Sequence, residues 1–153
     1  MKLRTRTFYK LTNLELYNIL QLRNEVFVIE QDCIYQDADG KDEKAIHVFF
    51  KDVDEIVAYL RVFKPGDYFE NASIGRVVVN PKYRGQGFGV EIMLKGIFQI
   101  VKQMQEKKIE ISAQTYLNKF YTRLGFKVVG EEYLEDNIPH IRMIYDVDDL
   151  PFS

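Results

Sequence analysis

Hydrophobic positions recur along the chain with two spacings, and each change of spacing marks the end of one element and the start of another. Apolar side chains three or four residues apart predict amphipathic helices, whereas short alternating or continuous apolar runs predict strands. We expect helices over residues 14–27, 90–104 and 117–124. We expect strands over residues 4–10, 46–50, 56–63, 72–79, 109–113, 127–134 and 140–147.

Cap and turn residues mark the ends of several of these elements. Thr12 or Asn13 is placed to cap the first helix, and Gly125 is placed to end the third. The polar residues 51–55 lie between two apolar runs, which is typical of a β-hairpin. The order of helices and strands predicts one mixed α/β domain over residues 1–153, with a mostly antiparallel sheet and helices on both faces.

Composition and charge exclude several classes of protein. The 21 basic and 23 acidic residues give a formal net charge of -2, without the basic excess of nucleic-acid-binding proteins, so we expect no nucleic-acid partner. Residues 1–11 lack the long apolar core of a signal peptide or membrane anchor, which predicts a cytoplasmic protein without a membrane partner. Because Cys33 is the only cysteine, no intrachain disulfide or cysteine-based metal cluster can form, and we expect no metal.

A strand, a glycine-rich turn and a helix follow one another in residues 75–90, GRVVVNPKYRGQGFGV. The first N–H groups of a helix lack acceptors and carry partial positive charge, and glycines let a bulky anion approach them. Arg84 adds a guanidinium suited to phosphate oxygens, so the stretch predicts a pyrophosphate site. Its spacing differs from two nucleotide-binding patterns, since it lacks a final Gly-Lys-Ser/Thr and reads G-x-G-x-G instead of G-x-G-x-x-G.

The glycine-rich turn resembles the acyl-CoA-binding signature Q/R-x-x-G-x-G/A of the GNAT superfamily of N-acetyltransferases, with Arg84, Gly87 and Gly89 at its fixed positions. Residues 113–126 resemble the second signature of that superfamily, a short helix ending in FYxxxGF. The order of elements is also similar, so the resemblance covers nearly the whole chain. Three stretches resemble the ElaA-type branch: LRNEVFVIEQ at 22–31, YQDADG at 35–40 and EDNIPH at 135–140. Asn137 replaces the usual glycine of that last stretch, and asparagine tolerates the left-handed conformation.

This resemblance implies that acetyl-CoA is the cosubstrate and that its acetyl group passes directly to an amine. In the superfamily the strand before the glycine turn pairs with the pantetheine arm and stabilises the oxyanion, which here implies a backbone N–H of Val78 or Val79 as the oxyanion donor. Asn118 matches a residue that contacts the cofactor arm, and Tyr121 matches the tyrosine that protonates the CoA sulfur. The cofactor-binding residues implied are Val77, Val78, Val79, Arg84, Gly85, Gln86, Gly87, Phe88, Gly89, Asn118 and Tyr121.

The general base is less sharply indicated than the general acid. Glu30 and His140 belong to segments that match the ElaA-type pattern, and we expect both on the acceptor side of the cleft as catalytic or acceptor-binding residues. His47 is a further candidate, although a histidine opening a strand is more often structural. The acidic stretch 31–44 could attract a cationic amine, although such a run is usually a solvated face.

Two other functions stay open at this point. One is a non-catalytic acyl-CoA-binding module of the same fold, and the other is a nucleotide-binding α/β domain. The acceptor is a small-molecule or peptide amine, with polyamines, amino sugars, antibiotics and protein N-termini all compatible with the sequence. A homodimer formed through an edge strand or the C-terminal strands is also open.

Overall fold

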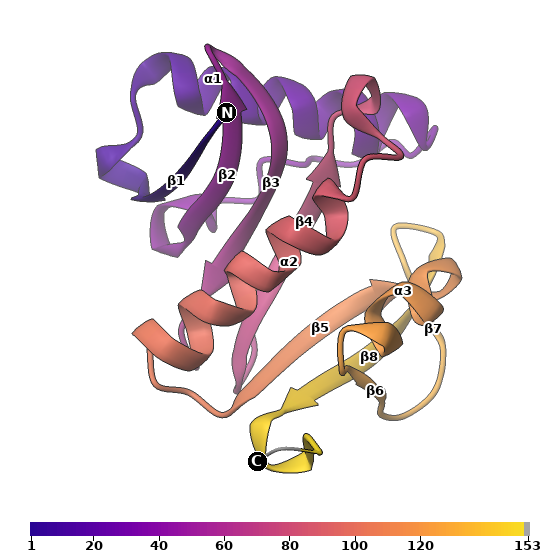
Figure 1. Ribbon diagram of the computed structural model, residues 1–153. Helices are drawn as coiled ribbons and strands as arrows, with labels where there is room; N and C mark the ends of the chain where they lie inside the picture. The colour runs from indigo at the N-terminus through magenta and orange to yellow at the C-terminus, as the bar shows by residue number, and fades with distance from the viewer. Residues whose placement is uncertain (152–153) are drawn as a thin grey trace.

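Eight strands form one sheet in the computed structural model, which describes residues 1–151 (Figure 1). Their order across the sheet is β1-β2-β3-β4-β5-β8-β6, and β7 also pairs with β8. The β4–β5 pair is parallel and the other pairs are antiparallel, which confirms the predicted mixed, mostly antiparallel sheet. The strands are β1 Lys2–Thr7, β2 Ile46–Asp52, β3 Glu55–Phe63, β4 Ala72–Val79, β5 Lys108–Gln114, β6 Lys127–Val128, β7 Tyr133–Glu135 and β8 Ile138–Asp146.

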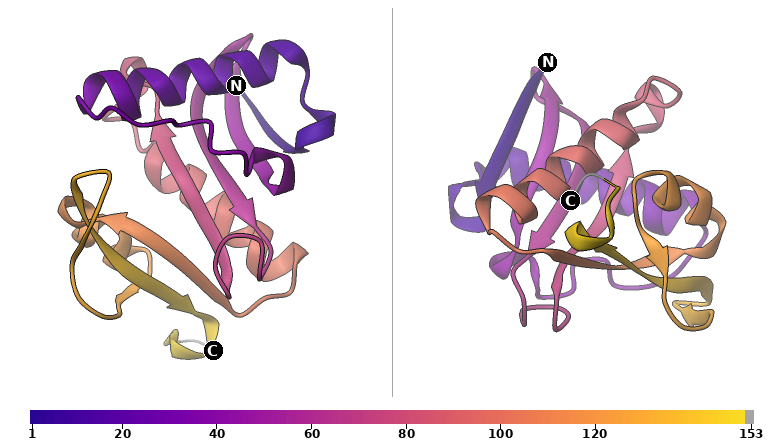
Figure 2. Two further views of the ribbon diagram at one scale, coloured as in Figure 1. Left: turned by 180° about the vertical axis from the view of Figure 1, so that it is seen from behind. Right: turned by 60° about the horizontal axis from the view of Figure 1, so that its bottom comes forward.

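Two long helices cover opposite faces of the sheet, as the views from the front and from behind show (Figures 1 and 2). Helix α1 packs Ile19 and Leu22 against Phe49 and Tyr59, whereas α2 contributes residues such as Met93 to a separate core on the other face. The helices are α1 Asn13–Arg23, continued by a π-helical segment Asn24–Glu30, then α2 Phe88–Phe98, continued by a π-helical segment Gln99–Gln103, and α3 Asn118–Arg123.

The hydrogen bonds at the start of α1 show which of Thr12 and Asn13 caps the helix. The Thr12 hydroxyl accepts a hydrogen bond from the Glu15 N–H at 3.0 Å, and the Glu15 carboxylate accepts one from the Thr12 N–H at 2.9 Å. This reciprocal capping box satisfies two N–H groups that the helix itself leaves without acceptors. Thr12 is therefore the cap, and Asn13 is the first helical residue.

Several predicted element boundaries differ from those of the structure. The first strand ends at Thr7, because the chain turns into a short 3-10 helix after it. The single strand expected over residues 127–134 is two short strands, β6 and β7, because Gly130 between them adopts φ +86° and interrupts the extended backbone. The second helix begins at Phe88, close to the expected start near Val90. In the β7–β8 turn Asn137 has φ +63°, the left-handed conformation that asparagine tolerates.

Strands β4 and β5 diverge soon after they begin. They pair only at Ala72 with Ile109 and at Ser73 with Glu110, and the gap between them widens from there (Figure 1). A β-bulge shifts the β3–β4 register in the same region and places Arg76 at φ +51°. That conformation costs a non-glycine residue on the order of 1–3 kcal/mol, and such strain is concentrated at functional sites.

A buried network of arginines and aspartates fastens the acidic segment 31–44 to the sheet. Its members are Arg23, Arg61, Arg76, Asp37, Asp39 and Asp42. Arg23 lies 2.9 Å from Asp37 and 2.7 Å from Asp42, and Arg61 lies 2.6 Å from Asp39 and 2.9 Å from Asp42. Burial alone would raise the pKa of Asp42, but hydrogen bonds from Arg23 and Arg61 lower it. These aspartates are therefore neither a solvated face nor free to attract a cationic amine.

His47 belongs to the same buried region and lies outside the cleft. Its Nε2 is 2.9 Å from the Asp42 carbonyl oxygen, which can only accept, so Nε2 carries the hydrogen. Its Nδ1 then accepts from the Tyr59 hydroxyl at 2.7 Å. Burial lowers the pKa of His47 below its ordinary value of 6.5, and the histidine is held neutral.

We expect acid to destabilise the protein in two stages. Below about pH 6.5 the unfolded chain protonates His47 while the folded chain does not, so the free energy of unfolding falls as the pH falls. The pKa of Asp39 and Asp42 is lowered from 3.8, so a second loss follows below about pH 4, where the unfolded chain protonates these carboxylates while the folded chain keeps them ionised. Urea denaturation at pH 8, 5 and 3 measures both stages.

His47→Gln tests the assignment of the first stage, and His140→Gln is the matched control. The His47 variant should show a smaller loss of stability between pH 8 and pH 5 than the wild type and the control. An unchanged loss in that variant would contradict the assignment.

Candidate active site

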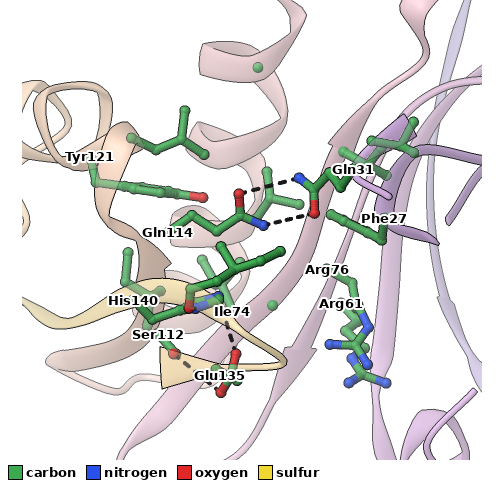
Figure 3. Close-up of a pocket in the computed structure, with 18 of the residues that line it drawn as sticks. Phe27, Gln31, Arg61, Ile74, Arg76, Ser112, Gln114, Tyr121, Glu135 and His140 are labelled. Atoms are coloured by element: carbon green, nitrogen blue, oxygen red, sulfur yellow. Dashed lines mark hydrogen bonds and ion pairs between the residues drawn. The ribbon is translucent and has the colours of Figure 1, made fainter. Parts of the chain in front are cut away.

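A cavity of about 660 Å³ lies where β4 and β5 diverge (Figure 3). One wall comes from β3, β4 and the end of the π-helical segment after α1, and the other comes from β5, α3, β8 and the β7–β8 turn. The sequence-predicted residues that line it are Glu30, Val77, Val78, Val79, Arg84, Gly85, Gly89, Tyr121 and His140. The sequence-predicted residues that do not line it are Gln86, Gly87, Phe88 and Asn118.

The glycine turn lies at one end of the cavity and presents the start of α2. Gly85 and Gly87 have φ +78° and +86°, which only glycine adopts readily, and they bring the backbone around into the helix. The Glu91 N–H makes the first helical hydrogen bond, to the Gly87 carbonyl at 3.1 Å. The N–H groups of residues 88–90 precede that bond and have no acceptor within the helix. This geometry fits a phosphate group.

Arg84 and Glu30 meet at the same end of the cavity. The two terminal nitrogens of Arg84 donate to the two carboxylate oxygens of Glu30 at 2.6 and 3.0 Å, a bidentate ion pair at the surface. The hydrogen bonds from Arg84 lower the pKa of Glu30, which makes the carboxylate a weaker base while it is paired. A phosphate that binds Arg84 must therefore compete with Glu30 for the guanidinium.

A pair of glutamines bridges the two walls. The Gln31 amide donates to the Gln114 carbonyl oxygen at 3.2 Å, and Gln114 donates back to Gln31 at the same distance. Gln31 follows the π-helical segment and Gln114 ends β5, so the pair spans the opening between the diverging strands (Figure 3). Sequence reasoning missed this contact, because nothing local in either segment indicates that the two would meet.

Tyr121 projects from α3 into the cavity. Its ring packs edge-on against Phe120 and Phe126, with centroid distances of 5.1 and 5.9 Å, and its hydroxyl points toward Gln114 (Figure 3). Burial and the nearby Tyr116 raise the pKa of Tyr121 above its ordinary value of 10.0. The hydroxyl therefore keeps its proton at neutral pH and can donate it.

His140 lies on the wall formed by β5 and β8, beside a carboxylate. Its Nδ1 is 2.7 Å from the Ile138 carbonyl oxygen and must carry a hydrogen, which leaves Nε2 as the atom that can take up a proton. Nε2 lies 3.3 Å from Glu135, and the Ser112 hydroxyl donates to the same carboxylate at 3.5 Å. The ring also stacks on Tyr133, at a centroid distance of 6.2 Å. Glu135 was not singled out in the sequence, although it opens the EDNIPH stretch.

Two arginines missed in the sequence, Arg61 and Arg76, line the opposite wall. They belong to β3 and β4, and Figure 3 shows them across the cavity from Glu135 and His140. The sequence places one arginine within each of two otherwise apolar strands. A buried arginine needs either a charged partner or a function, so this pattern could have indicated both residues. Both arginines have buried partners, and Arg76 is also within reach of the cavity.

Comparison with known proteins assigns the family. The chain matches the acetyltransferase (GNAT) domain family over residues 15–147. The ElaA protein of Escherichia coli is 42% identical over 135 residues, which cover 87% of this chain and 88% of that protein. The chain therefore belongs to the GNAT acetyltransferase family, whose fold supports acyl transfer from a CoA thioester.

Solved structures extend the similarity to the whole fold. The crystal structure of Escherichia coli ElaA has a TM-score of 0.87 at 37% identity and covers 95% of this chain and 100% of its own. An acyl-CoA N-acyltransferase from Pseudomonas aeruginosa has a TM-score of 0.88 at 37% identity and covers 95% of this chain and 99% of its own. The resemblance to the superfamily and to its ElaA-type branch is thus confirmed.

Two further observations concern only the described residues 1–151. They hold no group of three or more His, Cys, Asp or Glu side chains placed to bind a metal ion. None of their helices is long and apolar enough to cross a membrane.

Proposed function

We propose that this protein transfers the acetyl group of acetyl-CoA directly to the primary amine of a small molecule or peptide. The observation that carries the proposal is the cavity between β4 and β5, which runs from the glycine turn to the His140–Glu135 pair. In the reaction the amine nitrogen bonds to the thioester carbonyl carbon and the carbon–sulfur bond breaks. The nitrogen gives a proton to a base, and the departing sulfur receives one from an acid.

The backbone of β4 supports the assignment of the oxyanion donor. The Asn80 N–H donates to the Val57 carbonyl of β3 at 2.9 Å, and N–H groups alternate in direction along a strand. The Val79 N–H therefore points away from β3 and toward the gap that β5 leaves. This geometry favours Val79 over Val78 as the donor, and one such fixed donor contributes about 3 kcal/mol to lowering the barrier.

The general acid of the proposal is Tyr121. Its protonated hydroxyl points into the cavity, and the flanking Phe120 and Phe126 hold the ring in place (Figure 3). A thiolate leaving group takes the phenolic proton as the carbon–sulfur bond breaks. Tyr121 supplies this proton without forming a covalent intermediate.

Two residues are candidates for the base. His140 has an unprotonated Nε2 beside Glu135 when the histidine is neutral, and the Ile138 carbonyl fixes its ring. Glu30 is bound to Arg84 and its pKa is lowered, so it serves as a base only after Arg84 has turned to another anion. The geometry favours His140, acting directly or through a water molecule.

The proposal is tested by mixing the purified protein with acetyl-CoA and a panel of amines, and by measuring the thiol released as free CoA. We expect amine-dependent thiol release, together with CoA binding by calorimetry and no comparable binding of ATP or NAD. Binding of CoA without release for any amine would favour the non-catalytic acyl-CoA-binding module. Binding of ATP or NAD without a response to CoA would overturn the acetyl-CoA assignment.

Glu30→Gln tests whether Glu30 is the general base and whether it competes with phosphate for Arg84. Breaking the exposed Arg84–Glu30 pair frees the guanidinium, and such pairs contribute about 0.2–1 kcal/mol, so we expect CoA to bind up to about fivefold more tightly. Calorimetric titration with CoA measures this change, and single-turnover acetyl transfer measures the chemical step. Transfer at the wild-type rate would leave His140 as the base, whereas weaker CoA binding would contradict competition between Glu30 and phosphate.

A further inference from the structure

The acceptor end of the cavity carries opposite charges on opposite walls. Arg61 and Arg76 lie on the wall formed by β3 and β4, and Glu135 lies beside His140 on the other (Figure 3). Tyr68 also lines the cavity. Burial and the Glu135 charge raise the pKa of Tyr68, and the positive charge of Arg76 counteracts this increase. The Tyr68 hydroxyl therefore interacts electrostatically with residues of both walls.

Arg76 is held by one edge of its guanidinium. Its Nε is 2.9 Å from an Asp37 carboxylate oxygen, and its Nη2 donates to the Asp37 carbonyl at 3.1 Å and lies 3.5 Å from Asp39. The remaining terminal nitrogen, Nη1, has no hydrogen bond or ion pair with any of residues 1–151. The side chain is 18% exposed and lines the cavity, so this nitrogen is a charged donor with its orientation already fixed.

Three aromatic rings that line the cavity already contact guanidinium groups. Arg76 lies over the Tyr35 ring at 5.6 Å, and Arg61 lies over Phe63 at 5.1 Å and over Tyr68 at 5.8 Å. Ring faces that contact these cations do not form an aromatic cage for a further cation. These three rings therefore offer no aromatic cage to the second ammonium group of a polyamine.

We propose that the acceptor amine carries a carboxylate a few bonds away, as an α-amino acid does, and that Arg76 binds this carboxylate. The inference rests on the proposed acetyl transfer and names the acceptor class. Arg76 adjoins Val77 on the bulge of β4, so a carboxylate held there keeps the nearby amine beside the strand expected to carry the thioester. The amine then faces Glu135 and His140, the groups that attract it and take its proton.

Matched ligands test the proposal. Each of several amino acids is compared with the amine that lacks its carboxylate and with its amide, for example phenylalanine, phenethylamine and phenylalaninamide. Because a hydrogen bond between charged groups contributes about 1.5–3 kcal/mol, we expect kcat/KM to be at least about tenfold higher for the amino acid. In Arg76→Gln the difference in kcat/KM between the amino acid and the amine should disappear, and in Arg76→Lys part of this difference should remain.

Arg142→Gln is the control, because Arg142 forms a bidentate pair with Glu110 and does not line the cavity. This variant should keep the wild-type ratio of kcat/KM for the amino acid to kcat/KM for the amine. The ratio is internal to each variant, so partial unfolding of Arg76→Gln does not alter it. Equal or faster acetylation of the amines, or an unchanged ratio in Arg76→Gln, would overturn the proposal.

Binding measurements separate this inference from the proposed function. The same ligands are titrated calorimetrically into the wild type and Arg76→Gln, each saturated with CoA. Tighter binding of the amino acids to the wild type alone would support the carboxylate site even without acetyl transfer, in which case only the proposed function fails. No preference for the carboxylate would overturn the inference even in an active enzyme.

Discussion

We expect replacement of Tyr121 with phenylalanine to lower the rate of the proposed acetyl transfer by about 10²- to 10⁴-fold, the usual contribution of a general acid. The substitution removes only the hydroxyl, and the ring keeps its contacts with Phe120 and Phe126. CoA binding should therefore change little while turnover falls. Single-turnover acetyl transfer, compared with the calorimetric affinity for CoA, measures the two effects separately.

The control for Tyr121→Phe is Tyr17→Phe, because Tyr17 is 67% exposed and lies outside the cavity lining. It should transfer acetyl at the wild-type rate. Since burial and Tyr116 raise the pKa of Tyr121, the wild-type activity should also not fall near pH 10 through ionisation of this group. Unchanged turnover in Tyr121→Phe would remove the tyrosine from the mechanism and leave a water molecule or another side chain as the proton source.

Arg23→Met lowers the free energy of unfolding by about 3–5 kcal/mol, because it leaves two buried carboxylates without their shared partner. Arg23 is 0% exposed and contacts Asp37 at 2.9 Å and Asp42 at 2.7 Å. It also lies over the Tyr59 ring at 5.9 Å, and methionine replaces little of this contact. Urea denaturation monitored by circular dichroism measures the loss.

Lys82→Met is the matched control for Arg23→Met. Lys82 pairs with Glu55 at 3.2 Å, but its side chain is 68% exposed, so water replaces the lost contact and the stability should stay close to that of the wild type. Without Arg23, Asp42 still contacts Arg61 and Asp37 still contacts Arg76, but three aspartates face two arginines. Adding Asp42→Asn to Arg23→Met removes this excess of negative charge and should recover part of the loss. A loss for Arg23→Met no larger than that of the control would show that the network does not stabilise the fold.

The glycine turn before α2 was predictable because it depends on local properties of the chain. Gly85 and Gly87 adopt left-handed conformations, and α2 starts directly after them, so the consecutive residues themselves specify the turn. The Thr12 cap of α1 is local in the same sense. These features are specified by neighbours in the sequence, and a pattern can therefore indicate them.

The acceptor end was not predictable in the same way, because it depends on contacts between distant segments. Nothing in the apolar pattern of residues 109–113 indicates that pairing with β4 ends after Glu110 and opens a gap. The sequence of the acidic segment 31–44 is compatible with an amine-attracting loop or a solvated face, and it does not indicate the buried ion pairs because the arginine partners lie elsewhere in the chain. Glu135 beside His140, and Gln31 beside Gln114, are likewise brought together only by the folded sheet.

The Arg84–Glu30 pair has a consequence for how the protein responds to ionic strength. Added salt weakens an exposed contact between a guanidinium and a phosphate, and it weakens the contact of the same guanidinium with a carboxylate. Because Glu30 and the phosphate compete for Arg84, the two effects oppose each other. If CoA binds as proposed, its affinity is thereby partly buffered against changes in salt, in contrast to a site whose arginine is free before the ligand arrives.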